Sequence, residues 1–286
     1  MRRIVLLILA LATLLPSIVQ AYDVLVLQDR REAAYEEVQK GFNIGNIVSR
    51  RLLVLSEYSE VDVARIVRED KPSLILAIGT EAVTATRKVN NLPVVAVMSL
   101  DLNRLQASKS NLIGIAMFVP PERYIKIFKT MKTRRVGILY NPDKSGWYIS
   151  LARQAARAAS IELVTREVSD SRTVLEQFST LANKVDALWM LPDSTTVTKE
   201  TTEAYFRFSQ QQSIPLISFA SNYLGLGAAV VLEINHVDLG RQAGAITTAL
   251  LGGDEIDHSK LNFPTSISLK ANDSVLKHLG YSFVVE

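Results

Sequence analysis

The sequence contains no cysteine, and this absence removes several classes of chemistry at once. Disulfide bonds, thiol catalysis and zinc–thiolate sites are excluded, as is a lipid attached to an N-terminal cysteine. Histidine is also scarce: His236, His258 and His278 lie far apart, and we expect each at the surface or at a helix cap. The motifs of serine hydrolases, phosphate-binding loops and zinc metalloproteases are missing too. We therefore expect a protein that is not an enzyme and that uses no metal or other cofactor.

The chain also lacks a strong excess of charge. It has 32 basic and 29 acidic residues and a formal net charge of +3, of which Arg2 and Arg3 supply two. No cluster of lysine and arginine is interleaved with aromatic residues, although such clusters are the electrostatic signature of nucleic-acid binding. We therefore expect no nucleic-acid partner.

Long hydrophobic runs are absent except at the N-terminus. Residues 1–3 are positively charged, residues 4–15 are almost entirely apolar, and residues 19–21 place small side chains where a signal peptidase cleaves. This order is typical of a secretory signal peptide, whereas a membrane span needs about 18 or more apolar residues. We expect cleavage after Ala21 and a periplasmic mature chain. An uncleaved membrane anchor is the alternative.

The rest of the sequence alternates short apolar runs with amphipathic stretches of helical spacing. The apolar runs, such as residues 74–78 and 136–140, are continuous and do not alternate with polar residues. Such strands are buried on both faces, as in parallel sheets with helices on each side. We expect an α/β protein with two doubly wound parallel-sheet lobes. The strands that this pattern predicts span residues 22–27, 51–55, 74–78, 94–98, 112–117, 136–140, 161–165, 187–191, 215–219 and 266–269.

Two of the connecting segments are predicted to lack helix. Residues 101–111 are expected to form a polar loop, and the helix after strand 136–140 is expected to start only at residue 150. Residues 225–232 are rich in glycine and alanine, and the helix after them is expected to span residues 238–251.

Polar residues stand at the carboxyl ends of several expected strands, directly before a helix. Ligands of open α/β sheets bind at this edge, where helix N-termini present free N–H groups and a positive dipole end. Two facing sets of strand ends leave a crevice for a small molecule, in which Asp29 or Asp193 can pair with an ammonium group. Helix capping without ligand contact is the alternative. The predicted ligand-binding residues are Gln28, Asp29, Thr80, Ser99, Asn141, Asp193, Ser194 and Phe219.

Aromatic residues near this crevice are a second possible source of ligand contacts. Phe118, Trp147 and Tyr223 are expected to be core residues, whereas Phe219 ends a strand and is a candidate for stacking on a ring-bearing ligand. Asp193 and Ser194 form a possible nucleophile pair, but without a partnered histidine the capping interpretation is favoured.

Several segments together resemble the substrate-binding proteins of ABC importers, in the branch that includes tryptophan- and tyrosine-binding members. The similarity covers nearly the whole mature chain, and it is carried by the order and spacing of the segments. They read ILAIGT, GILYNPDKSG, MLPDST with IPLISFA, and HVDLGRQAGAITTALLGG followed by LNFPTSISLK. Thr80, Asp101, Asn141 and the pair Asp193-Ser194 match the family's polar strand-end positions. Ile113-Gly114 departs from the family's Thr-Gly pair and removes one hydroxyl from the expected cleft.

The resemblance implies a type I periplasmic-binding-protein fold whose two lobes are joined by three crossovers. Lobe one would span residues 22–118 with 236–253 returning to it, and lobe two residues 119–235 with 254–286 returning to it. It also implies closure around a small polar organic ligand, such as an amino acid, and delivery to an ABC permease in the inner membrane. We expect a monomer. A ligand sensor that signals to a membrane receptor or kinase is the alternative function.

Overall fold

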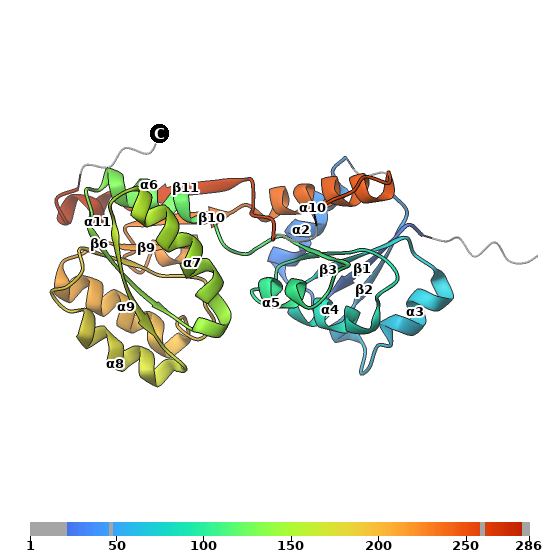
Figure 1. Ribbon diagram of the computed structural model, residues 1–286, viewed down its shortest axis with the longest axis horizontal. Coiled ribbons are helices and arrows are strands. Elements are labelled where there is room, and N and C mark those ends of the chain that lie inside the picture. Colours follow the sequence, from blue (N-terminus) through green and yellow to red (C-terminus); the bar gives the residue numbers. More distant parts are fainter. Residues whose placement is uncertain (1–21, 46–47, 258–260, 282–286) are drawn as a thin grey trace, which may run out of the picture.

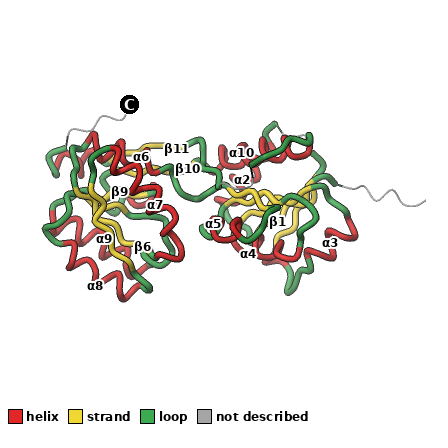
Figure 2. Tube along the Cα trace, in the orientation of Figure 1, coloured by secondary structure: helices red, strands yellow, loops and turns green. Residues whose placement is uncertain are grey.

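The computed structural model describes residues 22–45, 48–257 and 261–281 of the 286-residue chain. The chain forms two α/β lobes that lie side by side and are joined by narrow connections (Figure 1). Each lobe has a central, mostly parallel sheet between helices (Figure 2). The predicted fold class is therefore confirmed. The predicted signal peptide, residues 1–21, and His258 lie outside the described residues.

The first lobe is built on a five-stranded parallel sheet with the strand order β2-β1-β3-β4-β5. Its strands are β1 (Val24–Gln28), β2 (Arg50–Val54), β3 (Leu74–Ile78), β4 (Val94–Val97) and β5 (Leu112–Gly114). Its helices are α2 (Ala33–Asn43), α3 (Val63–Asp70), α4 (Thr80–Ala85) and α5 (Leu102–Ala107), with short 3-10 turns at Leu55–Glu57 and Thr86–Lys88.

Alternate residues of these strands enter separate hydrophobic clusters. Val24 and Val26 of β1 join the cluster that contains residues of α2, whereas Leu25 and Leu27 join the cluster beneath α3 and α4. Both sets are buried, because side chains alternate across a strand and helices cover both faces. This explains why the sequence shows continuous apolar runs.

The predicted loop at residues 101–111 is wrong, since it contains α5. This helix has only six residues, too few for a clear helical period in the sequence. It is held by tertiary contacts: Leu102 is buried, and the side-chain oxygen of Gln106 accepts a hydrogen bond from the backbone N–H of Gly114 at 3.0 Å.

The second lobe is built on a six-stranded sheet with the strand order β11-β10-β9-β8-β6-β7, in which only the β10–β11 pair is antiparallel. Its strands are β6 (Arg135–Tyr140), β7 (Glu162–Glu167), β8 (Ala187–Trp189), β9 (Leu216–Ser218), β10 (Val230–Ile234) and β11 (Ile267–Ala271). Its helices are α6 (Pro121–Thr130), α7 (Pro142–Ala158), α8 (Ser171–Leu181), α9 (Lys199–Gln212) and α11 (Asp273–His278), with a 3-10 turn at Ser221–Tyr223.

Helix α7 begins eight residues before its predicted start at residue 150. Asn141 is its N-cap and accepts a hydrogen bond from the backbone N–H of Asp143 at 2.9 Å, and Pro142 occupies the first turn. Proline is well suited to that position because its ring sets the helical φ angle and no N–H is needed there. Gly146 does not interrupt the helix, although in the sequence it resembles a break.

The chain passes between the lobes three times, as the resemblance implies. It leaves the first lobe after β5, returns from β10 into α10 (His236–Leu251), and crosses again to β11. Helix α10 packs closely on α2, because a Cβ added at Gly240 would lie 2.0 Å from the carbonyl oxygen of Val38. Two crossings are tied together, since Ala116 donates its N–H to the carbonyl oxygen of Asn262 at 2.8 Å.

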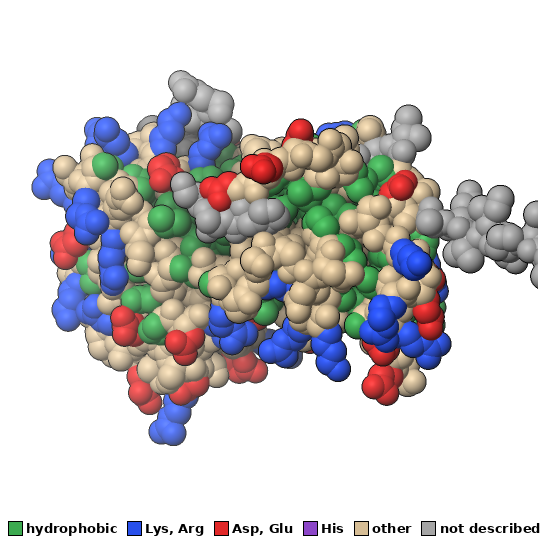
Figure 3. Space-filling model, turned by 45° about the vertical axis from the view of Figure 1, so that its right-hand side comes forward, with side chains coloured by type: hydrophobic (Ala, Val, Ile, Leu, Met, Phe, Trp, Pro, Cys, Tyr) green, Lys and Arg blue, Asp and Glu red, His purple; other side chains and the backbone are tan. Residues whose placement is uncertain are grey.

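The largest hydrophobic cluster is continuous between the lobes. It contains Ile115, Phe118 and Val119 of the first crossing together with core residues of both sheets. Because these crossing residues are buried in the cluster, the hinge is an apolar part of the core. On the face seen in Figure 3, by contrast, basic and acidic side chains are distributed over both lobes.

Candidate functional site

An open cavity of about 440 Å³ lies between the lobes at the carboxyl ends of their strands. The first lobe contributes residues that follow β4, and the crossings contribute both sides of the hinge. The second lobe contributes residues that follow β8 and β9 and the last residues of β10 itself. The lining residues are Met98, Leu100, Met117, Phe118, Val119, Tyr124, Tyr148, Pro192, Asp193, Ser194, Val197, Phe219, Ala220, Tyr223, Leu232, Glu233, Ile234 and His236. The cavity therefore lies where the parallel-sheet architecture places ligands.

Most of this lining is apolar, and aromatic rings form a large part of it. Phe118 packs on Tyr148 with ring centroids 4.7 Å apart, and Phe219 meets Tyr223 edge-on at 5.3 Å. The Tyr148 hydroxyl donates to the carbonyl oxygen of Val119 at 2.7 Å, and burial raises the pKa of Tyr148 well above its ordinary value. This hydroxyl is therefore hydrogen-bonded within the protein. Because aromatic rings form much of the lining, the cavity suits a flat or ring-bearing group.

Asp193 lines the cavity, but its carboxylate is already occupied by the protein. One oxygen accepts the backbone N–H of Asn141 at 2.9 Å and the hydroxyl of Ser145, and the other accepts the N–H groups of Thr195 at 2.8 Å and Thr196 at 3.3 Å. The residue is 2% exposed. An ionised carboxylate offers about four acceptor positions, so Asp193 is fully engaged in shaping this strand end.

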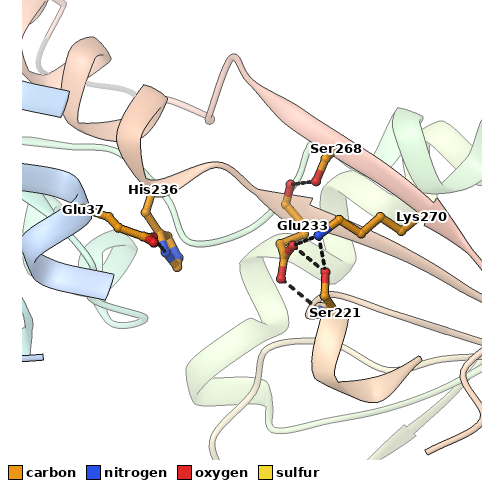
Figure 4. A network of polar contacts seen from close by, with 6 residues as sticks. All are labelled: Glu37, Ser221, Glu233, His236, Ser268 and Lys270. Carbon is orange, nitrogen blue, oxygen red and sulfur yellow. Dashed lines mark hydrogen bonds and ion pairs between the residues drawn. The ribbon is translucent and has the colours of Figure 1, made fainter. Parts of the chain in front are cut away.

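Glu233 is the second acidic residue of the lining, and it lies near the end of β10. It accepts the backbone N–H of Ser221 at 2.9 Å, the Ser221 hydroxyl, and the ammonium of Lys270 at 2.7 Å (Figure 4). Burial, the largest influence on the pKa of Glu233, acts to raise it, but the hydrogen bonds from Lys270 and Ser221 outweigh burial and lower it. The carboxylate is therefore charged at neutral pH.

His236 and Ser194 complete the polar lining. His236 is the first residue of α10, and its Nδ1 lies 3.1 Å from a carboxylate oxygen of Glu37 on α2. Ser194 is exposed, and its hydroxyl accepts a hydrogen bond from Lys144 Nζ at 2.6 Å. A cation from α7 therefore lies beside the second-lobe wall of the cavity.

The predicted residues Gln28 and Asp29 lie outside the cavity lining. Asp29 accepts the backbone N–H groups of Glu81, at 3.2 Å, and Ala82, and so caps α4. Gln28 is buried and donates to the carbonyl oxygen of Arg30 at 2.8 Å. In this structure both side chains are engaged in contacts within the first lobe.

Three other predicted residues also lie outside the lining. The Thr80 hydroxyl donates to the Ser99 hydroxyl at 3.0 Å, and Ser99 directly follows the lining residue Met98. Asn141 caps α7, as described above. Of the residues predicted from the sequence, the structure thus brings Asp193, Ser194 and Phe219 together at the cavity.

Residues 23–283 match the protein family described as "ABC transporter substrate binding protein". The chain belongs to this family.

Known relatives agree with this assignment. The tyrosine-binding protein of Clostridioides difficile (strain R20291) is 23% identical over 221 residues, which are 73% of this chain and 64% of that protein. The chain thus spans less than two thirds of the length of this relative.

Two solved structures share the fold of this family member. A ligand-free, open substrate binding protein with adhesive properties from Clostridium difficile has a TM-score of 0.70 at 19% identity and covers 91% of this chain and 95% of its own. An ABC domain in complex with L-Trp from Streptococcus pneumonia has a TM-score of 0.62 at 19% identity, with coverages of 90% and 94%.

Several residues that line the cavity were not predicted from the sequence. Glu233 and His236 flank the crossing that was expected between residues 235 and 236, but neither was singled out as a ligand contact, and the histidine was expected to be a surface or capping residue. Phe118 and Tyr223 line the cavity although they were expected to serve only the core. Met98 has a φ of 59°, in the left-handed region that non-glycine residues seldom adopt. No sequence signal indicates that conformation.

Within residues 22–45, 48–257 and 261–281, no three histidine or acidic side chains are grouped so that they could hold a metal ion. The same residues include no helix that is both long and apolar enough to cross a membrane.

Proposed function

We propose that this chain is a periplasmic solute-binding protein that captures an aromatic amino acid between its lobes and delivers it to a membrane permease. The observation that carries the proposal is the 440 Å³ cavity, whose wall combines aromatic rings with a few charged groups at the hinge. Relatives with tyrosine or tryptophan in their names support the choice of ligand.

The apolar wall accounts for part of the affinity. An aromatic side chain buries about 150–250 Å², and at about 25 cal/mol per Å² this burial contributes roughly 4–6 kcal/mol before ordering costs. A micromolar dissociation constant corresponds to about 8 kcal/mol. Polar contacts to the amino and carboxylate groups therefore have to supply the remainder.

Closure of the lobes is part of this proposal. The crossings form a compact hinge, because Asn262 donates its N–H to the carbonyl oxygen of Gly114 at 3.0 Å while Gln242 on α10 donates to the carbonyl oxygen of Phe263 at 2.9 Å. Such tied connections favour rotation of whole lobes, with the ligand selecting the closed state. Closure would bring first-lobe groups such as Thr80 and Ser99 toward the ligand.

The remaining parts of the proposal concern location and organisation. The charged and then apolar N-terminus supports export with cleavage after Ala21. Mass spectrometry of the exported protein, expected to begin at Tyr22, tests this step. We place lobe one at residues 22–118 with 236–253 and lobe two at 119–235 with 254–286, in a monomeric protein that is not an enzyme.

A thermal-shift screen of amino acids and sugars tests the ligand. At 100 times its dissociation constant a ligand adds about 2.7 kcal/mol to the free energy of unfolding. Aromatic amino acids are expected to raise the melting temperature and to reduce the radius of gyration in small-angle scattering. Stabilisation by sugars alone, or by none of these compounds, would contradict the proposal.

A further inference from the structure

Glu233 has an acceptor position that its protein partners leave open. It receives three hydrogen bonds, two from Ser221 and one from Lys270, whereas about four positions are available on a carboxylate. Its side chain is 30% exposed. Asp193, the other carboxylate of the described lining, receives four hydrogen bonds and is 2% exposed. Of these two carboxylates, Glu233 is therefore the one that can still accept a hydrogen bond from a cationic group in the cavity.

Lys270 already occupies one side of that carboxylate. It belongs to β11 and does not line the cavity, and its side chain is 46% exposed. Its Nζ lies 2.7 Å from Glu233 Oε2 and 2.6 Å from the Ser221 hydroxyl oxygen. Figure 4 shows Lys270 reaching Glu233 from β11, while His236 points toward Glu37. The lysine thus approaches from the side of β11 and holds the carboxylate with an internal positive charge.

A second cation at the same carboxylate meets repulsion from the first. Two like charges a few ångströms apart repel each other substantially at the effective dielectric constant of a protein surface. The contact between Lys270 and Glu233 must therefore weaken or break when another cation binds the carboxylate. We infer that Glu233 binds the cationic group of the ligand and that Lys270 is an internal competitor that weakens this binding. This inference rests on the proposed function, because it assumes that the ligand occupies the 440 Å³ cavity.

The arrangement selects a chemical class. The aromatic wall takes a ring and Glu233 takes an ammonium group, so an arylalkyl amine fulfils both requirements even without a carboxylate. An aromatic acid that lacks the amine would leave Glu233 without a new partner and would gain nothing from it. Lys270 does not line the cavity, so it is not placed to bind a ligand carboxylate there.

Calorimetric titration with matched ligands tests the inference. One series is L-tryptophan, tryptamine and indolepropionate, and the other is L-tyrosine, tyramine and hydroxyphenylpropionate. In the wild-type protein the amino acid and the amine of at least one series are expected to bind at least about tenfold more tightly than the acid. If, in every series that binds, the acid binds as well as its amine, the inference is overturned.

Two substitutions separate the roles of the pair. Glu233→Gln keeps the shape and should weaken the amino acid and the amine by about tenfold or more, with the acid unaffected. Lys270→Met should tighten both amine-bearing ligands by about threefold to tenfold. Lys184→Met removes an exposed lysine of the second lobe outside the cavity and should leave all affinities unchanged. Circular dichroism and melting temperature confirm that each variant folds.

The double variant Glu233→Gln/Lys270→Met tests competition itself. Most of the gain from Lys270→Met should disappear when Glu233 is neutral, because the lysine then has no carboxylate to occupy. An equal gain in both backgrounds, or weaker L-tryptophan and L-tyrosine binding in Lys270→Met, overturns the role of Lys270. If Glu233→Gln leaves the affinities for the amino acid and the amine unchanged, the inference is overturned, but the proposed function is not. If the wild type binds none of the six ligands, the proposed function fails and the inference fails with it.

Discussion

Asp193 accepts the backbone N–H of Asn141 at 2.9 Å, although the two residues are 52 positions apart in the sequence. Asn141 follows β6 and Asp193 lies just beyond β8, its neighbour in the sheet, so one carboxylate ties two strand ends together. Asp29 has a similar role in the first lobe, where it follows β1 and caps the helix that follows β3. Each lobe thus has a carboxylate that organises its cavity-facing edge.

Replacing Asp193 should therefore affect folding first. Asp193→Ala leaves buried N–H groups without an acceptor, and we expect a loss of about 2–4 kcal/mol in the free energy of unfolding, measured by urea denaturation. Asp143→Ala is the matched control, because Asp143 is exposed in the first turn of α7, and it should cost less than about 1 kcal/mol. Unchanged stability with weakened ligand binding would instead make Asp193 a direct ligand contact.

The aromatic wall predicts a loss of affinity when Phe219 is truncated. Phe219 lines the cavity and packs edge-on against Tyr223. Phe219→Ala should weaken an aromatic ligand by about tenfold or more, because ring contacts and apolar burial are both lost. Leu175→Ala, at a position 47% exposed on α8, should leave the affinity unchanged. Equal affinities of wild type and Phe219→Ala in calorimetry would remove this residue from the site.

Replacing two glycines by alanine should change the stability in opposite directions, because Gly240 lies at the contact between α2 and α10 and Gly146 does not. Gly240→Ala places a Cβ 2.0 Å from the carbonyl oxygen of Val38, and we expect it to cost about 3 kcal/mol or more. Gly146→Ala, within α7, meets only a ring carbon of Tyr140 at 4.0 Å, so it should stabilise by about 0.5–1 kcal/mol. Thermal denaturation of both variants checks this. Similar effects at both positions would contradict the close packing of α10.

Lys109 predicts a pH dependence of stability. Burial lowers its pKa to about 8, whereas an unfolded chain has a lysine pKa near about 10.4. Between these values the unfolded state holds more protons, so the contribution of this group to stability rises with pH. The rise should appear above about pH 8, where the fraction of charged lysine in the folded state falls.

The measurement belongs between about pH 8 and pH 9.5, because tyrosines act in the opposite direction at higher pH. The pKa of Tyr22 is raised to about 12, mainly by burial, so its contribution falls once unfolded tyrosine ionises near about pH 10. Lys109→Met should flatten the rise seen in urea denaturation, and Lys184→Met should retain it. A rise that persists in Lys109→Met would assign it to another group.

Much of the fold is predictable from the sequence because burial on both faces leaves a local signal. Residues 74–78 and 136–140 are continuous apolar runs, and they correspond to β3 and to all but the first residue of β6. Helix α5 was missed because six residues do not show a clear period, and α7 starts early because Pro142 begins a helix that Asn141 caps. In both cases tertiary contacts and capping outweighed the local pattern.

The sequence by itself determined two α/β lobes and a polar edge on each, since apolar runs and the residues that end them are local features. Only the tertiary structure decided how the groups on those edges are used. Asp29 and Asp193 accept donors from distant segments, whereas Glu233 meets Lys270 from a strand that the chain reaches after its third crossing. Hydrogen-bond satisfaction depends on which distant segments come together in the folded chain, and no local pattern encodes that.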